Sequence, residues 1–169
     1  MRLAPAEFQF NFLLPRGTNF DAQQNPVIRA HFIRRYFSQF NPDYDLWHSL
    51  QQYPSYFPNY RTKQLLTIHD LNFLVEKSSK KQEKYLELLK RNIDKATAIN
   101  CISEYTASVL KSNINIDGKP MRIIYCGSKL HEFPEFEPNF PWLQKKYFFS
   151  VGIFNDKKNF EVLIPVMKY

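Results

Sequence analysis

The sequence predicts an α/β fold in which helices cover both faces of a mainly parallel β-sheet. Segments with strand patterning alternate with helical segments along most of the chain, and this alternation implies right-handed crossovers between parallel strands. Polar residues or glycines follow several apolar strand-like runs, so the carboxyl ends of the strands would gather them at one edge of the sheet. The chain has 169 residues, of which 44% are apolar, which suits one domain with a buried core.

Two elements are expected before residue 43. Aromatic and polar residues alternate over Glu7–Leu14, which predicts a strand. Asn25 followed by Pro26 is typical of a helix start, and Asn41-Pro42 would end that helix. The helix would carry an apolar stripe at helical spacing, formed by Ile28, Phe32, Tyr36 and Phe40.

The middle of the chain shows the alternation most clearly. Short apolar runs predict strands, and capped segments with apolar residues at helical spacing predict helices. Ser79 and Gln82 have the spacing of a capping box at the start of one such helix. Its apolar stripe would be Tyr85, Leu89, Ile93 and Ala96. In chain order we expect a buried strand at Tyr44–His48, a loop at Gln51–Arg61, a strand at Lys63–Ile68, that helix, a strand at Ala98–Ile102, a helix at Glu104–Lys111 capped by Ser103, and a strand at Met121–Tyr125.

The last quarter of the chain differs in composition. Residues 129–146 contain three prolines among acidic and aromatic residues without a clear period, which predicts a linker. A strand at Tyr147–Phe154 and a helix at Lys158–Tyr169, interrupted by Pro165, are expected to follow. The predicted organisation is therefore a domain at residues 1–128, a linker at 129–146, and the first strand and helix of a second domain at 147–169.

The net charge of +7 favours anionic partners but does not choose among them. Basic residues are scattered rather than interleaved with aromatics, so we expect no nucleic-acid partner. Cys101 and Cys126 each lie in an apolar run, which predicts two buried thiols in a reducing cytoplasm rather than a disulfide scaffold. No apolar stretch has the length of a membrane span, so any membrane contact is expected at the surface.

Polar residues at the predicted strand ends are the candidates for chemistry. His69, followed by Asp70, ends a buried strand, where it could donate a hydrogen bond to a sugar hydroxyl or a phosphate, or simply cap the strand. His48 ends the preceding strand and could line the same cleft. A two-histidine metal site lacks a third ligand at suggestive spacing, so no metal is expected. Gly127 and Gly152 follow two later strands.

Two further groups lie where helices begin. Ser103-Glu104 opens a helix, where the serine is an ordinary cap or helps to hold an anion or a hydroxyl. Lys157 and Lys158 occupy the usual phosphate position of a strand–helix unit, although such a pair is commonly solvated surface. The sequence lacks the phosphate-loop, dinucleotide-binding, nucleophile-elbow and zinc-protease motifs.

Taken in order, five segments resemble the family-four glycosyltransferases, a retaining family with two Rossmann-like domains in the GT-B architecture. None of the five segments is specific alone, but five in this order and at these separations are specific together. They cover most of the chain from about Asp43 onward. The segments are Tyr44–Ser49, Leu65–Leu71, Ala98–Thr106, Arg122–Gly127 and Tyr147–Gly152, the last continuing to Lys157–Phe160.

The resemblance implies a Rossmann-like three-layer sandwich that moves a sugar from a nucleotide donor to an acceptor, without a cofactor beyond the nucleotide sugar. It implies that His69 reaches the donor sugar and diphosphate and that Lys158 contacts the diphosphate. Lys157 falls where a mannosyltransferase-like subgroup has arginine, whereas Ile153 stands where many members have arginine. Ser103 and Glu104 match the start of the helix after the fourth strand.

Two departures from the family suggest a fragment truncated at both ends. The family begins with a strand and a glycine-rich loop that have no counterpart here, and its donor-holding glutamates would lie beyond Tyr169. We therefore expect the fragment to be inactive alone. The apolar residues after 147 are expected to dock on the sheet, within one chain or in a homodimer.

The leading hypothesis is a retaining hexosyltransferase that builds cell-surface polysaccharide, such as lipopolysaccharide or capsule, on a glycan or lipid-linked acceptor. It would be cytoplasmic, with peripheral contact to the anionic inner face of the membrane. The alternative is a non-catalytic basic module that binds phosphate-bearing polymers, for which a continuous basic stripe would be the sign. A nucleotide-sugar epimerase ranks lower, because the cleft would offer few carboxylates beyond Asp70 and Glu104.

Overall fold

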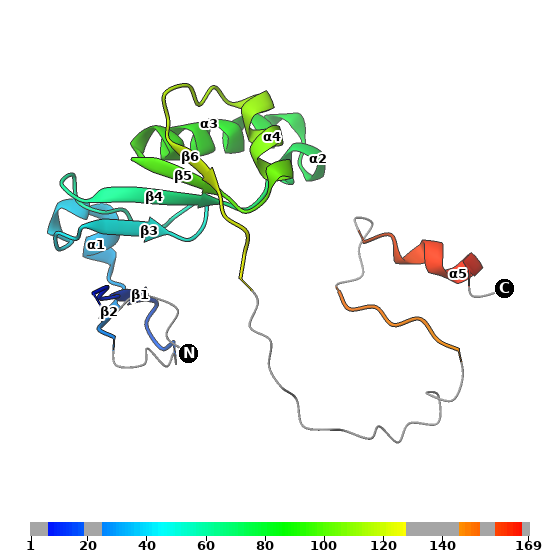
Figure 1. The fold of residues 1–169 in the computed structure, drawn as a ribbon, viewed down its shortest axis with the longest axis horizontal. Coiled ribbons are helices and arrows are strands. Elements are labelled where there is room, and N and C mark those ends of the chain that lie inside the picture. Colours follow the sequence, from blue (N-terminus) through cyan, green and yellow to red (C-terminus); the bar gives the residue numbers. More distant parts are fainter. Residues whose placement is uncertain (1–6, 19–24, 128–145, 153–157, 167–169) are drawn as a thin grey trace, which may run out of the picture. The chain divides into compact units, whose positions relative to one another are not determined.

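The computed structural model describes residues 7–18, 25–127, 146–152 and 158–166 (Figure 1). The chain divides into two compact units, residues 1–127 and residues 128–169. The first unit contains the main sheet, and the described residues of the second include two short helical turns. The predicted linker at 129–146 lies outside the described residues except for Lys146, as do Ile153 and Lys157.

The first unit is built on a four-stranded, fully parallel sheet. Its strands are β3 (Leu46–Ser49), β4 (Lys63–Ile68), β5 (Ala98–Cys101) and β6 (Met121–Ile123), in the spatial order β3-β4-β5-β6. Mixed α/β structure with a parallel sheet confirms the predicted fold class. Parallel neighbours need crossover connections, which helices supply after β4 and β5.

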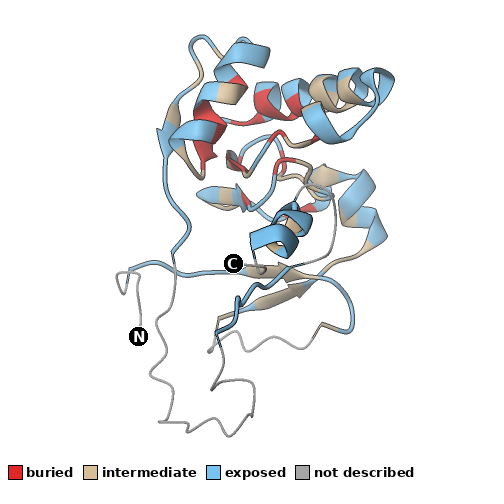
Figure 2. Ribbon diagram, turned by 90° about the vertical axis from the view of Figure 1, so that its right-hand side faces the viewer, coloured by how far each residue is buried: buried red, intermediate tan, exposed pale blue. Residues whose placement is uncertain are grey.

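The helices α2 (Phe73–Glu76), α3 (Ser79–Lys95) and α4 (Glu104–Asn113) make these crossovers. Leu66 and Ile99 are register partners in β4 and β5, and they share one buried core with Leu89 of α3 and Leu110 of α4. The buried positions, red in Figure 2, gather in this unit. The described strand order is sequential, so right-handed crossovers place the two long helices on one face. Helices on both faces would require an order that reverses within the sheet, so that part of the prediction is wrong for the described elements.

The elements with the clearest patterns form where the sequence predicts them. β4 has the predicted bounds, and the stripe residues Leu89 and Ile93 of α3 are buried. Ser103 caps α4 by accepting a hydrogen bond from the Thr106 backbone N–H at 3.1 Å. The predicted capping box is wrong: Ser78 is the N-cap of α3, and Gln82 Nε2 donates to the Lys77 carbonyl at 2.8 Å.

The predictions before residue 43 are only partly confirmed. Only β1 (Phe12–Leu14) is a strand within Glu7–Leu14, and it pairs in parallel with β2 (Val27–Arg29), where a helix was predicted. Helical turns follow at α1 (Phe32–Tyr36) and η1 (Ser38–Phe40). The aromatic stripe is not a core face, since Phe32, Tyr36 and Phe40 are 63%, 72% and 61% exposed.

Two smaller expectations also need correction. β3 is an edge strand whose Leu46 is 55% exposed, so it is not the buried strand that was predicted. Cys101 is buried as expected, but Cys126 is exposed, because it lies just beyond the end of β6.

In the second unit, the predicted strand at Tyr147–Phe154 is not formed over its described residues, 147–152. A strand requires a neighbouring strand, and none of the described strands pairs with this segment. The helical prediction beyond Lys158 is met by η4 (Phe160–Val162) and α5 (Leu163–Val166), with Pro165 inside the first turn of α5, where proline is tolerated.

Candidate functional site

The carboxyl ends of β3 and β4 surround an open hollow of about 530 Å³. His69 and Asp70 follow β4 directly and line this hollow. The segment after β3 lines the rest of it with Leu50, Gln51, Gln52 and Tyr53. The structure therefore places the predicted His69-Asp70 pair at the edge of a parallel sheet, where ligands of α/β proteins bind.

Gln52 holds the two sides of the hollow together. Its side-chain oxygen accepts from the His69 backbone N–H at 3.1 Å, and its amide nitrogen donates to the Asp70 carbonyl at 2.7 Å. Asn92 of α3 in turn donates to the Gln52 carbonyl at 2.9 Å. Gln52 is buried, so these bonds replace water and fix the backbone that carries His69.

The His69 ring is oriented by the chain after β3. Its Nε2 lies 2.7 Å from the Leu50 carbonyl, and a carbonyl only accepts, so Nε2 carries the proton. The neutral ring then has Nδ1 as a hydrogen-bond acceptor. Protonation adds an Nδ1–H donor, so the same atom can accept from a sugar hydroxyl or donate to a phosphate oxygen.

Ser103 connects to His69 through Thr106. The Thr106 hydroxyl donates to the His69 carbonyl at 2.9 Å, so its proton is used there. The hydroxyls of Ser103 and Thr106 are 3.0 Å apart, and the Ser103 hydroxyl must therefore be the donor of that pair. Two residues singled out from the sequence, His69 and Ser103, thus belong to one hydrogen-bonded chain across β4 and α4.

The other predicted residues of the first unit lie apart from this chain. Asp70 is exposed and accepts from the Asn72 backbone N–H at 3.0 Å, which makes a local turn. Glu104 is exposed at the start of α4. Gly127 is exposed with open space where a side chain would stand, so its surroundings do not themselves require glycine.

His48 occupies a face of the sheet rather than the end of a strand. It is the third residue of β3, and its Nε2 lies 2.8 Å from the Thr67 hydroxyl of β4. Asn100 of β5 donates to the same hydroxyl at 3.3 Å, which leaves the Thr67 proton available to His48. Removal of water from around the ring lowers the pKa of His48 below its usual value. The three side chains form a polar ladder across three strands.

The second unit contains the other predicted phosphate contacts. A side chain at Gly152 would approach the Phe160 ring to 3.3 Å, with the Lys158 side chain 4.0 Å away, so the glycine lets these residues lie close together. Lys158 is thus beside Gly152, as the sequence spacing suggests. Lys157 lies outside the described residues.

Sequence reasoning did not find Gln52 or Thr106. Gln52 lies in a segment that its prolines mark as a loop, and its only signal is its place three residues after a strand end. Thr106 lies three residues after the helix cap, where the backbone N–H commonly donates to the cap side chain. That position is the signal that could have identified it.

Within the described part of the chain, no three His, Cys, Asp or Glu side chains are grouped as a metal site would require. No described helix is long and apolar enough to cross a membrane.

The parallel sheet with helical crossovers, and the polar hollow beyond its carboxyl edge, define a Rossmann-like α/β domain. The model of Glycosyltransferase Family 4 matches residues 5–132, which is more than half of the chain. The chain belongs to Glycosyltransferase Family 4. No curated protein and no solved structure matches it.

Proposed function

We propose that the chain serves a retaining hexosyltransferase, which moves a sugar from a nucleotide-sugar donor to a glycan or lipid-linked acceptor in cell-surface polysaccharide assembly. The observation that carries this proposal is the place of His69, which lines the hollow beyond β4 while its backbone carbonyl accepts from Thr106, the hydrogen-bond partner of Ser103. Family membership supports sugar transfer in general, and the hollow offers a place for a polar ligand.

In the proposed reaction, the acceptor hydroxyl oxygen bonds to the anomeric carbon of the sugar as the bond from that carbon to the donor diphosphate breaks. The diphosphate leaves with the electron pair and takes up the acceptor proton. His69 would accept from a sugar hydroxyl at Nδ1 when neutral, or donate there to the diphosphate when protonated. Lys158 is proposed to contact the diphosphate, whose developing charge a fixed cation stabilises.

We further propose that the enzyme works at the cytoplasmic face of an anionic membrane. The support is α1 and η1, where exposed Phe32, Tyr36 and Phe40 accompany Arg34 and Arg35. Aromatic rings and arginines are the side chains that favour a membrane interface.

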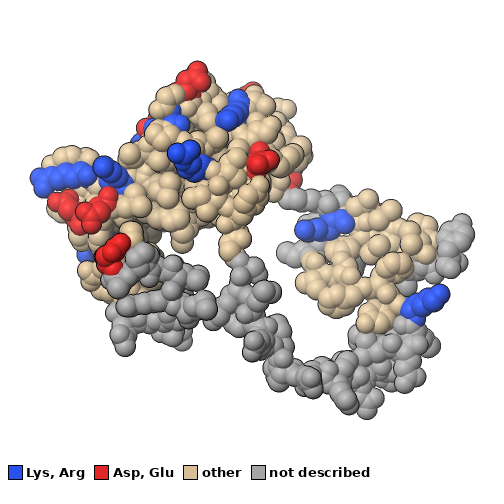
Figure 3. Space-filling model, in the orientation of Figure 1, with Lys and Arg blue, Asp and Glu red and all other residues tan. Residues whose placement is uncertain are grey.

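The alternative basic module receives less support. It requires a continuous basic stripe, but on the face shown in Figure 3 the Lys and Arg side chains form separate groups interspersed with Asp and Glu. The net charge of +7 alone does not distinguish the two functions.

The test is titration of the chain with a panel of nucleotide sugars, followed by calorimetry and by the melting temperature, which a bound ligand raises. We expect one donor to bind, and His69→Ala to weaken it by about tenfold, the effect of one lost hydrogen bond to a charged group. His31→Gln serves as the control, since His31 caps α1 and does not line the hollow. If no nucleotide sugar binds, or if both variants weaken binding equally, the assignment of His69 fails.

A further inference from the structure

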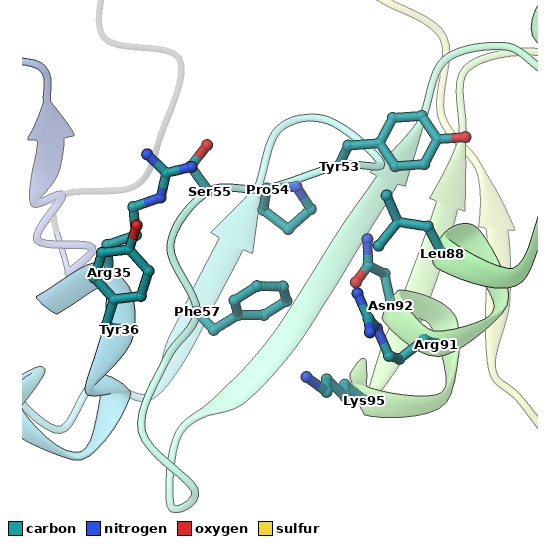
Figure 4. A pocket seen from close by; sticks show the side chains of 10 residues that line it. All are labelled: Arg35, Tyr36, Tyr53, Pro54, Ser55, Phe57, Leu88, Arg91, Asn92 and Lys95. Carbon is teal, nitrogen blue, oxygen red and sulfur yellow. The ribbon is translucent and has the colours of Figure 1, made fainter. Parts of the chain in front are cut away.

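A second cavity, of about 370 Å³, lies between α1, the segment after β3 and the carboxyl-terminal half of α3 (Figure 4). This volume is in the range of small-molecule sites. Tyr53 alone is shared with the hollow at His69. Arg91 and Lys95 come from the last turns of α3, which lead into the amino end of β5, whereas His69 lies at the carboxyl end of β4.

Three cations from two helices line this cavity: Arg35 of α1 and Arg91 and Lys95 of α3. None of the lining residues is acidic. Among the described residues the sole ion pair is that of Arg61 with Asp43, so none of the three cations has an acidic partner there. The helix dipole favours a cation in the last turn and can account for Lys95 of α3 and Arg35 of α1, but it does not account for Arg91.

The three cations repel one another in the empty cavity. Arg91 and Lys95 are four residues apart on one helix, and like charges at this spacing destabilise a helix, although Glu87 and Asp94, at helical spacing from Arg91, offset part of this repulsion. Arg35 adds a third positive charge from the other side of the cavity. A bound anion would remove the repulsion that remains, so the cluster favours an anionic ligand.

Aromatic rings form part of the wall and contact two of the cations. Lys95 Nζ lies 4.9 Å from the centroid of Phe57, and the Arg35 guanidinium carbon lies 5.8 Å from that of Tyr36. Both are distances of cation–π contacts. Figure 4 shows the Phe57 ring between the α1 side chains and those of α3.

The segments around the cavity are fixed to one another. Buried Asn41, which follows η1, donates to the Phe57 carbonyl at 2.7 Å and to the Arg34 carbonyl at 3.4 Å. Buried Asn92 donates to the Gln52 carbonyl at 2.9 Å, and this joins α3 to the same loop. The three cations are exposed, but the segments that carry them are therefore connected to one another.

We propose that this cavity binds a phosphate-bearing ligand, a phosphate or diphosphate attached to a ring or other apolar group, at a site separate from the donor site at His69. The guanidinium groups of Arg35 and Arg91 can each bind a phosphate through paired N–H donors, and the Lys95 ammonium adds a further positive charge. The aromatic wall suits the group that carries the phosphate. The ligand is either a soluble phosphate ester or the headgroup of a lipid, and the proposal holds whether or not the chain transfers sugar.

The test compares two charge-matched triple variants of the full chain. Arg35→Gln, Arg91→Gln and Lys95→Gln together neutralise the cavity, whereas Lys81→Gln, Lys84→Gln and Lys90→Gln neutralise three exposed cations of α3 outside it. Binding of inorganic pyrophosphate is measured by calorimetry at low salt. We expect the cavity variant to lose about tenfold or more in affinity and the control variant to lose less than about threefold, as screened surface charges do.

Further arms identify the ligand and separate the two sites. One arm adds vesicles of phosphatidylcholine with phosphatidic acid. If these vesicles compete with pyrophosphate, and if the cavity variant no longer binds them, the ligand is a lipid headgroup. If pyrophosphate binds without such competition, the ligand is a soluble ester. His69→Ala should leave pyrophosphate affinity unchanged. The proposal is overturned if the two triple variants lose affinity equally, if His69→Ala abolishes pyrophosphate binding, or if neither pyrophosphate nor the vesicles bind.

Discussion

Gln52 is the residue on which the geometry at His69 depends most. Its buried side chain makes one hydrogen bond to the His69 N–H and one to the Asp70 carbonyl, and no other described side chain bonds to both backbones. Gln52→Ala would leave both groups without a partner in a poorly hydrated place. We expect a loss of about 1–3 kcal/mol in the free energy of unfolding, measured by urea denaturation.

The neighbouring residue gives a matched control. Gln51 is exposed, and Gln51→Ala should change the free energy of unfolding by less than about 0.5 kcal/mol. Gln52→Ala should also weaken nucleotide-sugar binding, because it frees the strand end that positions the His69 ring. Equal stability of the two variants would mean that water replaces Gln52 without cost.

At the scale of elements, the polar ladder of β3, β4 and β5 makes the sheet sensitive to pH. The pKa of His48 is lowered in the folded chain because burial disfavours the charged ring. The unfolded chain, in which histidine titrates near pH 6.5, therefore binds more protons just below that pH. The free energy of unfolding should fall as the pH drops through about 6.5, and this part of the fall should cease below the folded pKa.

His48→Gln tests this dependence. Glutamine keeps a polar group near Thr67 but does not titrate, so the variant should lose less stability than the natural chain between about pH 7.5 and pH 5.5. Urea denaturation at the two pH values gives both losses. The same loss in both chains would show that the ladder leaves the His48 charge solvated.

The elements also show what the sequence could predict. β4 and α4 were predicted correctly because each has a strong sequence pattern and a buried face. β4 is apolar and bounded by polar residues, and α4 begins with a serine cap whose hydrogen bond is formed. The stripe from Ile28 to Phe40 has helical spacing but no core to face, since its aromatic side chains are exposed. Spacing alone therefore cannot distinguish a core helix from a short strand followed by exposed turns.

The candidate site also contains residues that could be predicted from the sequence and contacts that could not. His69 and Ser103 were predicted because strand ends and helix caps can be located from sequence. Their connection through Thr106 could not be, because it joins residues 37 positions apart and depends on how α4 packs against β4. His48 was expected at the end of its strand, but β3 continues to Ser49, so His48 is paired within the sheet and lies on its face.

At the scale of the first unit, the two cysteines should report its stability. Cys126 is exposed beyond β6, whereas Cys101 is buried in β5 with its sulfur 3.9 Å from that of Met121. Burial raises the pKa of the Cys101 thiol, although the charge of Lys111 opposes this, so Cys101 is also less often a reactive thiolate. A thiol reagent in native buffer should therefore modify Cys126 rapidly and Cys101 only when the sheet opens.

In a Cys126→Ser variant, labelling of the remaining thiol then measures opening of the core. If β5 is exposed only by global unfolding, Cys101 should react more than about a thousandfold more slowly than a free thiol. The reason is that a domain stable by about 5 kcal/mol is unfolded for less than about a thousandth of the time. The rate should rise with urea along the same slope as global unfolding, followed by mass spectrometry. Labelling of Cys101 at a rate near that of Cys126, or independent of urea, would instead mean that β5 separates locally from β6 while α3 and α4 stay packed.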